Sequence, residues 1–254
     1  MDEPYYIINS TVRTLDMLEY LAKVDEASVS EMSNQFKVNK STAHRFLASM
    51  KYRGFLTQNE DNQKYKLSFK LFEIGNSVVS RLNIHDVARP IMDKLCQKTG
   101  ETINLGVVDQ SEVVYISKSV SSNSLRMDSP IGGRDPVYCT GLGKSILAFK
   151  SNETIRRYIS ENQFIERTSN TITDIEAFYE ELVIIKEKGY ALDREEIILG
   201  LCCIAAPIFN QERDPIAAIS ISVPKIRLKE TGIEFYALDV LQASQQISMG
   251  MGAR

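Results

Sequence analysis

The segment from Asn39 to Arg53 separates hydrogen-bond donors from apolar side chains by helical position. Apolar side chains recur at i, i+3, i+4 and i+7 along one face, the spacing of a helix that buries that face: Ala43, Phe46, Leu47 and Met50. The opposite face carries donors: Lys40, Ser41, Thr42, His44, Arg45, Ser49 and Arg53. Such a helix can place cations against phosphates and donors against base edges in a major groove. An ordinary solvated helix has the same composition, so both interpretations stay open for this helix alone.

The segments around this helix favour the first interpretation. Two helical patterns precede it, and we expect Ser10 and Ser30 to cap their first turns. Two strand-like runs follow it, residues 55–58 and 64–67, with a turn-rich segment between them. Three helices and a hairpin make a winged helix-turn-helix, in which Lys64 and Lys66 would bring the wing to backbone phosphate.

Charge is unevenly distributed along the first third of the chain. The whole sequence has 30 Lys and Arg against 33 Asp and Glu, a net charge of -3. Residues 1–36 hold two bases against seven acids, whereas residues 37–66 hold seven bases against two acids. The local excess of 7 - 2 = +5 therefore lies on the segment that contains the donor-rich helix.

Composition and residue spacing argue against several other classes of protein. A length of 254 residues predicts two domains of about 100–150 residues each. The four cysteines and two histidines form no CxxC or HxxxH spacing, so we expect no zinc site, disulfide framework or cofactor. The acidic start Met1-Asp2-Glu3 and the lack of a long apolar run predict a cytoplasmic protein with no membrane partner.

A second candidate site lies at residues 140–144, just before the helical pattern of residues 146–149. Backbone amides at a helix start point outward and attract anions. Gly143-Lys144-Ser145 also matches the end of the phosphate loop GxxxxGK[ST], but Tyr138 stands where the first glycine belongs. We therefore expect an anion site here and no nucleotide hydrolysis.

Four blocks of sequence make the chain resemble IclR-type bacterial transcriptional regulators, and the likeness covers nearly its whole length. They are residues 38–47 (VNKSTAHRFL), 130–144 (PIGGRDPVYCTGLGK), 189–196 (GYALDREE) and 200–208 (GLCCIAAPI). The resemblance implies an α+β protein that forms dimers or tetramers. Its parts would be a winged helix-turn-helix DNA-binding domain over residues 1–68, a linker helix over 69–84, and a GAF-like effector-binding and oligomerisation domain with an antiparallel sheet over 85–254.

The residue patterns agree with this plan. Residues 70–82 form a helix that is apolar on more than one side, which favours packing on a partner subunit or on both domains. Later patterns predict helices at 86–99 and 175–188 and another that begins near residue 235. They also predict two hairpins, at 103–117 and 203–223.

The resemblance also implies an effector site for a small carboxylate. Its matching positions are Ser124, Met127, Asp135, Gly141, Leu142, Asp193, Cys203, Ser220 and Ser222. Gly141 and Leu142 would offer amides to the carboxylate, and Asp135 and Asp193 would bind hydroxyl groups, as a sugar acid presents. A cysteine in such an apolar run is more often a small core residue than a ligand contact, and this alternative stays open for Cys203. We expect Glu195 and Glu196 to be a solvated pair at a turn.

Three functions are compatible with these features. The leading one is a DNA-binding regulator, a repressor in the first place, whose affinity for double-stranded operator DNA depends on the effector. It would act as a homodimer or a dimer of dimers. A second is a DNA-binding protein whose C-terminal domain only oligomerises it. A third is an enzyme that uses Asp135, Asp193 and Lys144, although no catalytic residue set stands at a recognised spacing and we expect no enzyme.

Overall fold

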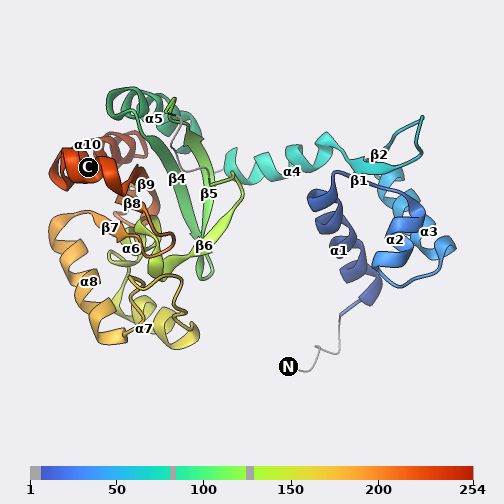
Figure 1. Cartoon of the computed structure of the whole chain (residues 1–254), viewed down its shortest axis with the longest axis horizontal. Coiled ribbons are helices and arrows are strands. Elements are labelled where there is room, and N and C mark those ends of the chain that lie inside the picture. The colour runs from blue at the N-terminus through green and yellow to red at the C-terminus, as the bar shows by residue number, and fades with distance from the viewer. Residues whose placement is uncertain (1–6, 81–83, 124–128, 254) are drawn as a thin grey trace. The chain divides into compact units, whose positions relative to one another are not determined.

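The computed structural model describes residues 7–80, 84–123 and 129–253. The chain divides into two compact units, Met1–Arg81 and Leu82–Arg254, each of which is described by itself (Figure 1). Among the described residues, no helix is both long and apolar enough to cross a membrane.

The N-terminal unit is a helix-turn-helix followed by a β-hairpin and one more helix. Strand β3 is central in its small sheet and pairs antiparallel with β1 and β2. Three helices and the hairpin are confirmed, and the two-residue strand β1 adds a third strand to the sheet. The elements are α1 (Asn9–Val24), β1 (Glu26–Ala27), α2 (Val29–Gln35), α3 (Lys40–Tyr52), β2 (Leu56–Gln58), β3 (Tyr65–Leu67) and α4 (Phe69–Ser80).

The N-cap residues of α1 and α2 differ from the two serines that the sequence predicted. Helix α1 has Ile8 at its N-cap with no side-chain cap, so the prediction for Ser10 is wrong. Ser28 caps α2 instead of Ser30, in a capping box with Glu31. In both helices the N-cap lies two residues upstream of the expected serine.

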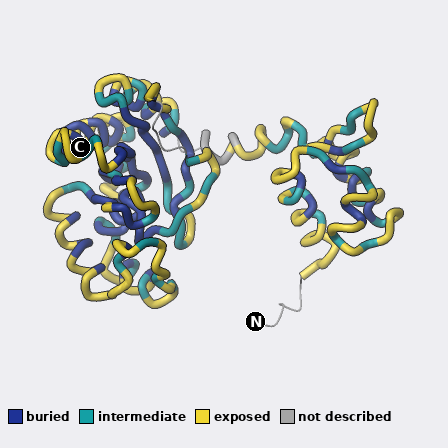
Figure 2. Tube along the Cα trace, in the orientation of Figure 1, coloured by how far each residue is buried: buried dark blue, intermediate teal, exposed yellow. Residues whose placement is uncertain are grey.

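The core of the N-terminal unit lies between its helices and the small sheet. Met17 and Leu21 of α1, Met32 of α2 and Leu47 of α3 are almost completely buried, together with Tyr65 of β3. Figure 2 shows these buried segments at the centre of the unit and exposed turns around them. Because one face of α3 is buried in this core, the side chains on its opposite face are exposed to solvent.

The C-terminal unit is built on a six-stranded, fully antiparallel sheet of order β6-β5-β4-β9-β8-β7. Both predicted hairpins are present, as β4–β5 and β8–β9. The strands are β4 (Thr102–Asp109), β5 (Glu112–Ser119), β6 (Arg134–Pro136), β7 (Ala191–Arg194), β8 (Leu201–Phe209) and β9 (Pro215–Pro224). The helices are α5 (Ile84–Thr99), a 3-10 turn η1 (Val137–Cys139), α6 (Gly141–Leu147), α7 (Asn152–Glu161), α8 (Ile175–Lys188), α9 (Lys225–Thr231) and α10 (Ile233–Gly250).

Helices cover the sheet from both sides. Helices α5 and α10 pack together against β4, β5, β8 and β9. Helix α6 packs against β4, β7, β8 and β9, with α8 against it in turn. The core around α6 includes Leu142, Ile146, Phe178 and Leu182, all buried. The predicted α+β class, with an N-terminal helix-turn-helix and a C-terminal antiparallel sheet, is confirmed.

Candidate functional site

Helix α3 divides into a buried face and an exposed face as the sequence predicted. Ala43, Leu47 and Met50 are buried against the unit's core, and Phe46 is half-buried. Most of the predicted contact residues are exposed: Lys40, Ser41, His44 and Arg45. Thr42 is half-buried. The exposed set occupies the first two turns of the helix.

Asn39 fixes the start of this surface. Its side-chain Oδ1 accepts a hydrogen bond from the Thr42 amide at 2.8 Å and one from the Ser41 hydroxyl at 2.8 Å. Within the part of the chain that the structure describes, Lys40 and Arg45 form no ion pair. Their charges are therefore available to a partner.

The two lysines predicted for the wing face different surroundings. Lys64 Nζ lies 3.4 Å from Glu31 Oε1 and is partly neutralised by it. Lys66, on the central strand β3, is exposed and lines a surface pocket with Asp25 and Glu26. Acidic neighbours weaken the attraction of both lysines for phosphate relative to Lys40 and Arg45.

In the C-terminal unit the strand register gathers polar residues into one row. Asp193 of β7 pairs with Cys203 of β8, and Cys203 pairs with Ser222 of β9. Ser220 stands two residues before Ser222, on the same face of its strand, opposite Asn104 of β4. These residues line one cavity with the start of α6. Neighbouring strands thus bring together side chains that are far apart in the sequence.

Helix α6 closes the cavity with its N-terminus. The Thr140 hydroxyl caps the helix by accepting from the Gly143 amide at 3.1 Å. The amides of Gly141 and Leu142 belong to the first turn, which has no intrahelical acceptors. Gly141 also packs closely, since a Cβ there would lie 3.3 Å from Ala205 Cβ. The two amides are suited to an anion in the cavity.

Two carboxyl groups line the same cavity. Asp135 Oδ2 accepts from the Tyr115 hydroxyl at 2.9 Å, and Asp193 Oδ1 accepts from the Glu196 amide at 2.7 Å. Burial raises the pKa of Asp193 to about 7, and the nearby Glu196 carboxylate adds to the increase. Burial also raises the pKa of Asp135, against the opposing effect of the Tyr115 hydrogen bond. Near neutral pH Asp193 therefore changes between acceptor and donor.

Sequence reasoning missed Asn104, Tyr115 and the half-buried Ile197 as cavity residues. Asn104 Nδ2 donates to Ser222 Oγ at 3.0 Å, while its Oδ1 is buried without a hydrogen-bond partner among the described residues. The sequence did offer a signal for Asn104, because it is a polar residue inside the otherwise apolar run 103–108. The structure adds a buried acceptor at the cavity wall.

Lys144 does not belong to the cavity. Its side chain is fully buried, and its Nζ lies 2.5 Å from Glu196 Oε1 and 3.3 Å from Glu181 Oε1. The Ser145 hydroxyl donates to the Leu142 carbonyl. Both polar residues of the Gly143-Lys144-Ser145 segment thus bind the protein itself. This arrangement differs from a phosphate loop, in which the lysine reaches the phosphates.

The expectation of a solvated pair at Glu195 and Glu196 is wrong. Glu196 is 1% exposed and holds Lys144, and Glu195 is 8% exposed. Glu195 pairs with Lys225 and accepts from the Gly200 amide at 2.8 Å. Each carboxylate can be buried because a cation and a backbone amide replace water around it. The amide is that of Gly200 for Glu195 and, at 3.4 Å, that of Arg194 for Glu196.

The cavity collects the described members of the predicted effector set. They are Asp135, Gly141, Leu142, Asp193, Cys203, Ser220 and Ser222. Ser124 and Met127 lie outside the described residues. The cavity has a volume of about 80 Å³. A space of this size suits a small molecule.

Comparisons with known proteins find similarity to the same family in both units. The family model "IclR helix-turn-helix domain" matches residues 10–60, and "Bacterial transcriptional regulator IclR C-terminal" matches residues 76–249. The HTH-type transcriptional regulator KdgR of Escherichia coli is 36% identical over 245 residues, which cover 96% of this chain and 93% of KdgR.

Two further relatives cover both units as well. The transcriptional repressor IclR of Escherichia coli is 32% identical over 248 residues, with 96% of this chain and 90% of the repressor covered. The crystal structure of the Thermotoga maritima IclR superposes with a TM-score of 0.86 at 33% identity, covering 96% of this chain and 99% of that one. The chain belongs to the IclR family of DNA-binding bacterial transcriptional regulators.

Proposed function

We propose that this chain is a repressor whose affinity for operator DNA is set by a small hydroxylated organic acid, such as a sugar acid, bound in the C-terminal cavity. The observation that carries the proposal is the convergence of seven predicted effector residues, from four strands and α6, on one cavity. A relative named as a transcriptional repressor supports repression. Because its partner is operator DNA, we propose that it acts in the cytoplasm.

We propose that α3 is the helix that contacts DNA, through the following residues. Lys40, Ser41, Thr42, His44 and Arg45 would contact base edges and phosphates, and Lys64 and Lys66 would contact phosphates from the hairpin. The proposed domains are residues 1–68 for DNA binding, 69–84 as a linker helix and 85–254 for effector binding and oligomerisation. A dimer then presents two α3 helices to two half-sites.

The polar groups of the cavity define the proposed ligand. The amides of Gly141 and Leu142 bind its carboxylate. Asp135, Asp193 and the unpartnered Asn104 Oδ1 accept hydrogen bonds from its hydroxyl groups, and Ser220 and Ser222 offer further hydroxyls. A bare keto acid would leave these acceptors without donors, which costs binding energy. A compact acid such as glycerate fits the volume, and a longer sugar acid requires Ile197 and its neighbours to move.

Calorimetric titration of the full chain with glycerate, gluconate and pyruvate tests the ligand class. We expect glycerate or gluconate to bind at least about tenfold more tightly than pyruvate, the equivalent of one hydrogen bond left unmade. Asn104→Leu should remove most of this preference, whereas Asn170→Leu, an exposed position outside the cavity, should leave it unchanged. Tighter binding of pyruvate would contradict the ligand assignment.

A C-terminal domain that only oligomerises the protein is the alternative. Saturating effector should raise the melting temperature of an effector-binding chain and lower its affinity for operator DNA in a mobility-shift assay. A coupling of about 1–3 kcal/mol changes DNA affinity roughly 5- to 150-fold. If none of a panel of small organic acids changes either quantity, the alternative holds.

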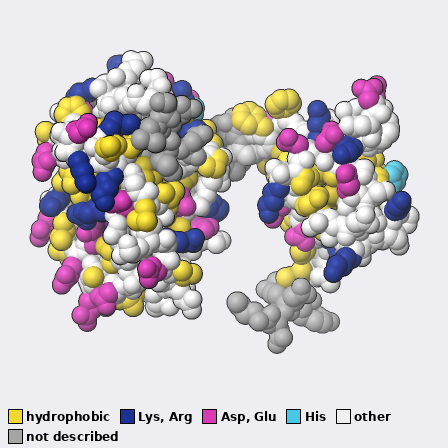
Figure 3. All heavy atoms as spheres, viewed as in Figure 1, with side chains coloured by type: hydrophobic (Ala, Val, Ile, Leu, Met, Phe, Trp, Pro, Cys, Tyr) yellow, Lys and Arg dark blue, Asp and Glu magenta, His cyan; other side chains and the backbone are white. Residues whose placement is uncertain are grey.

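We propose that α4 joins subunits into a homodimer or a dimer of dimers. Phe69 is 85% exposed and Phe72 is 69% exposed, and Figure 3 shows uncovered hydrophobic side chains on α4. Apolar surface of this kind is characteristic of protein interfaces. Light scattering should give a lower mass for Phe72→Glu than for the unchanged chain, with Tyr52→Glu on α3 as a control.

A further inference from the structure

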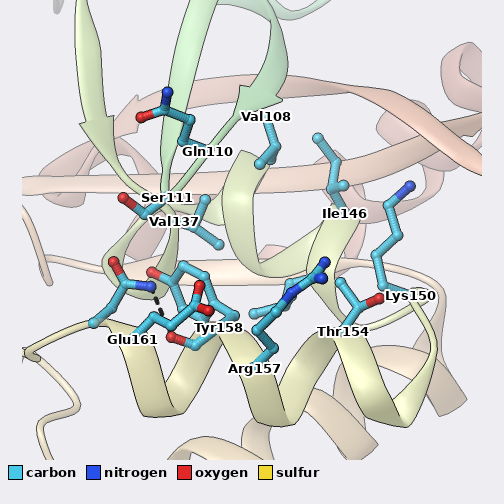
Figure 4. A pocket seen from close by; sticks show the side chains of 12 residues that line it. Val108, Gln110, Ser111, Val137, Ile146, Lys150, Thr154, Arg157, Tyr158 and Glu161 are labelled. Carbon is cyan, nitrogen blue, oxygen red and sulfur yellow. Dashed lines mark hydrogen bonds between the residues drawn. The ribbon is translucent and has the colours of Figure 1, made fainter. Parts of the chain in front are cut away.

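A second and larger pocket lies in the C-terminal unit, between α7, the end of α6 and the turn that joins β4 to β5 (Figure 4). It has a volume of about 570 Å³ and shares no lining residue with the effector cavity. The volume falls within the range of about 300–1,000 Å³ that is typical of pockets for small organic ligands. No part of the proposed function uses this pocket.

The floor of the pocket is apolar. Val108, Val137, Ile146 and Leu147 line it, with the ring of Tyr158 beside them. The Tyr158 hydroxyl already accepts a hydrogen bond from the Tyr138 amide at 3.1 Å, so its polar end is satisfied within the protein. The floor therefore favours a ligand with an apolar body.

The cations of the pocket stand around this floor. The guanidinium of Arg157 forms no ion pair or hydrogen bond within the described part of the chain. Figure 4 shows it extending from α7 toward Ile146, between Thr154 and Tyr158. Lys150 lines the same pocket, with its Nζ 2.7 Å from Asp214 Oδ1. An unpaired arginine next to apolar surface is suited to a carboxylate, which it binds by two parallel hydrogen bonds.

The acidic group of the pocket lies away from Lys150. Figure 4 places Glu161 at the opposite end from Lys150, near Tyr158. Neighbouring Asn162 donates from its side chain to the Tyr158 carbonyl at 2.7 Å. Because Lys150 is paired with Asp214, an anionic head is favoured beside Arg157 and disfavoured near Glu161.

We infer that this pocket is a second ligand site, for a monoanionic organic acid whose carboxylate pairs with Arg157 and whose apolar body lies on the floor formed by Val108, Val137, Ile146 and Leu147. This site is independent of the effector cavity, with which it shares no lining residue. Its ligand differs from the hydroxylated acid proposed for the cavity, because the four residues of its floor have no hydrogen-bonding side chain.

Equilibrium dialysis of the full chain against radiolabelled octanoate tests the site. We expect one octanoate per protomer, and at least about tenfold weaker binding of 1-octanol, which lacks the charge. Arg157→Gln should weaken octanoate binding about tenfold or more, and Arg157→Lys should restore part of the loss. Arg156→Gln is the matched control, because Arg156 is exposed on α7 like Arg157 but does not line the pocket.

Several results would overturn the inference. They are equal binding by Arg157→Gln and the unchanged chain, equal losses in both arginine variants, or many weak octanoate sites per protomer. Displacement of octanoate by glycerate, together with loss of octanoate binding in Asn104→Leu, would place octanoate in the effector cavity instead. The glycerate titration tests the effector cavity by itself, so either proposed site can be disproved while the other stands.

Discussion

At the residue scale, we expect the binding of the proposed acidic effector to depend on pH through Asp193. Its pKa of about 7, raised mainly by burial, means that it is mostly neutral below pH 7 and mostly charged above it. The charged form repels an anionic ligand, so affinity for glycerate should fall as pH rises from 6 to 8. Calorimetry at both pH values checks this. Asp193→Asn should show a much smaller pH dependence, and an unchanged dependence in that variant would assign the effect to another group.

Arg45 is the residue whose loss should affect DNA binding most directly. It is exposed on α3 and unpaired among the described residues. Arg45→Ala should weaken operator binding by about 1–3 kcal/mol if Arg45 contacts a base, and should relax specificity at that position. A mobility-shift assay measures both quantities, with Lys23→Ala on α1 as the charge-matched control. Equal affinities of the unchanged chain and Arg45→Ala would remove Arg45 from the interface.

The sequence predicted individual site residues where a family motif or a simple periodicity placed them. Gly141, Leu142 and Ser220 were found in this way, and all three line the cavity. Asn104 was missed because its position opposite Ser220 depends on strand pairing, which one strand alone does not reveal. Glu196 was misjudged for a related reason, since its partner Lys144 lies 52 residues away. Long-range pairing decides whether such groups are buried.

At the element scale, the start of α6 tolerates no extra atoms. A Cβ on Gly143 would lie 2.5 Å from both the Cα and the carbonyl oxygen of Val137, and backbone atoms there cannot move freely. Gly143→Ala should therefore destabilise the C-terminal unit by about 1–3 kcal/mol. The melting temperature should fall by about 2–4 °C for each kcal/mol.

Gly75→Ala is the matched control for this prediction. A Cβ on Gly75 meets nothing within 4 Å, and the residue lies inside α4. Alanine is the better helix former, so this variant should keep or raise stability by up to about 1 kcal/mol. Similar losses in both variants, measured by calorimetric melting, would contradict the steric explanation.

Elements with strong periodicity were predicted well, and weak local signals were not. Helix α3 begins after Asn39 as expected, and both hairpins of the larger sheet are present. Strand β1 has two residues and carries no period of its own, so its pairing with β3 was missed. Ser30 and Ser28 are equally good caps by residue type, and the capping box with Glu31 selects Ser28.

At the scale of the whole molecule, each unit has its own buried core. Met17, Met32 and Leu47 belong to one cluster, whereas Leu142 and Phe178 belong to another. A fragment of residues 82–254 should therefore fold alone, bind glycerate like the full chain and lose operator binding. Circular dichroism, calorimetry and a mobility-shift assay check these points in turn. A fragment without a cooperative thermal transition would show that the C-terminal unit needs the rest of the chain.

The burial of Lys144 also makes its acylation a measure of how often the C-terminal unit unfolds. Acylating reagents attack free lysine amines, and this amine is covered on every side and held by two carboxylates. Surface lysines such as Lys186 should be labelled within the native protein, while Lys144 should gain its acyl group only in molecules that have unfolded. Mass spectrometry of the peptide that contains Lys144 would thus time that event in a mixture where most molecules remain native.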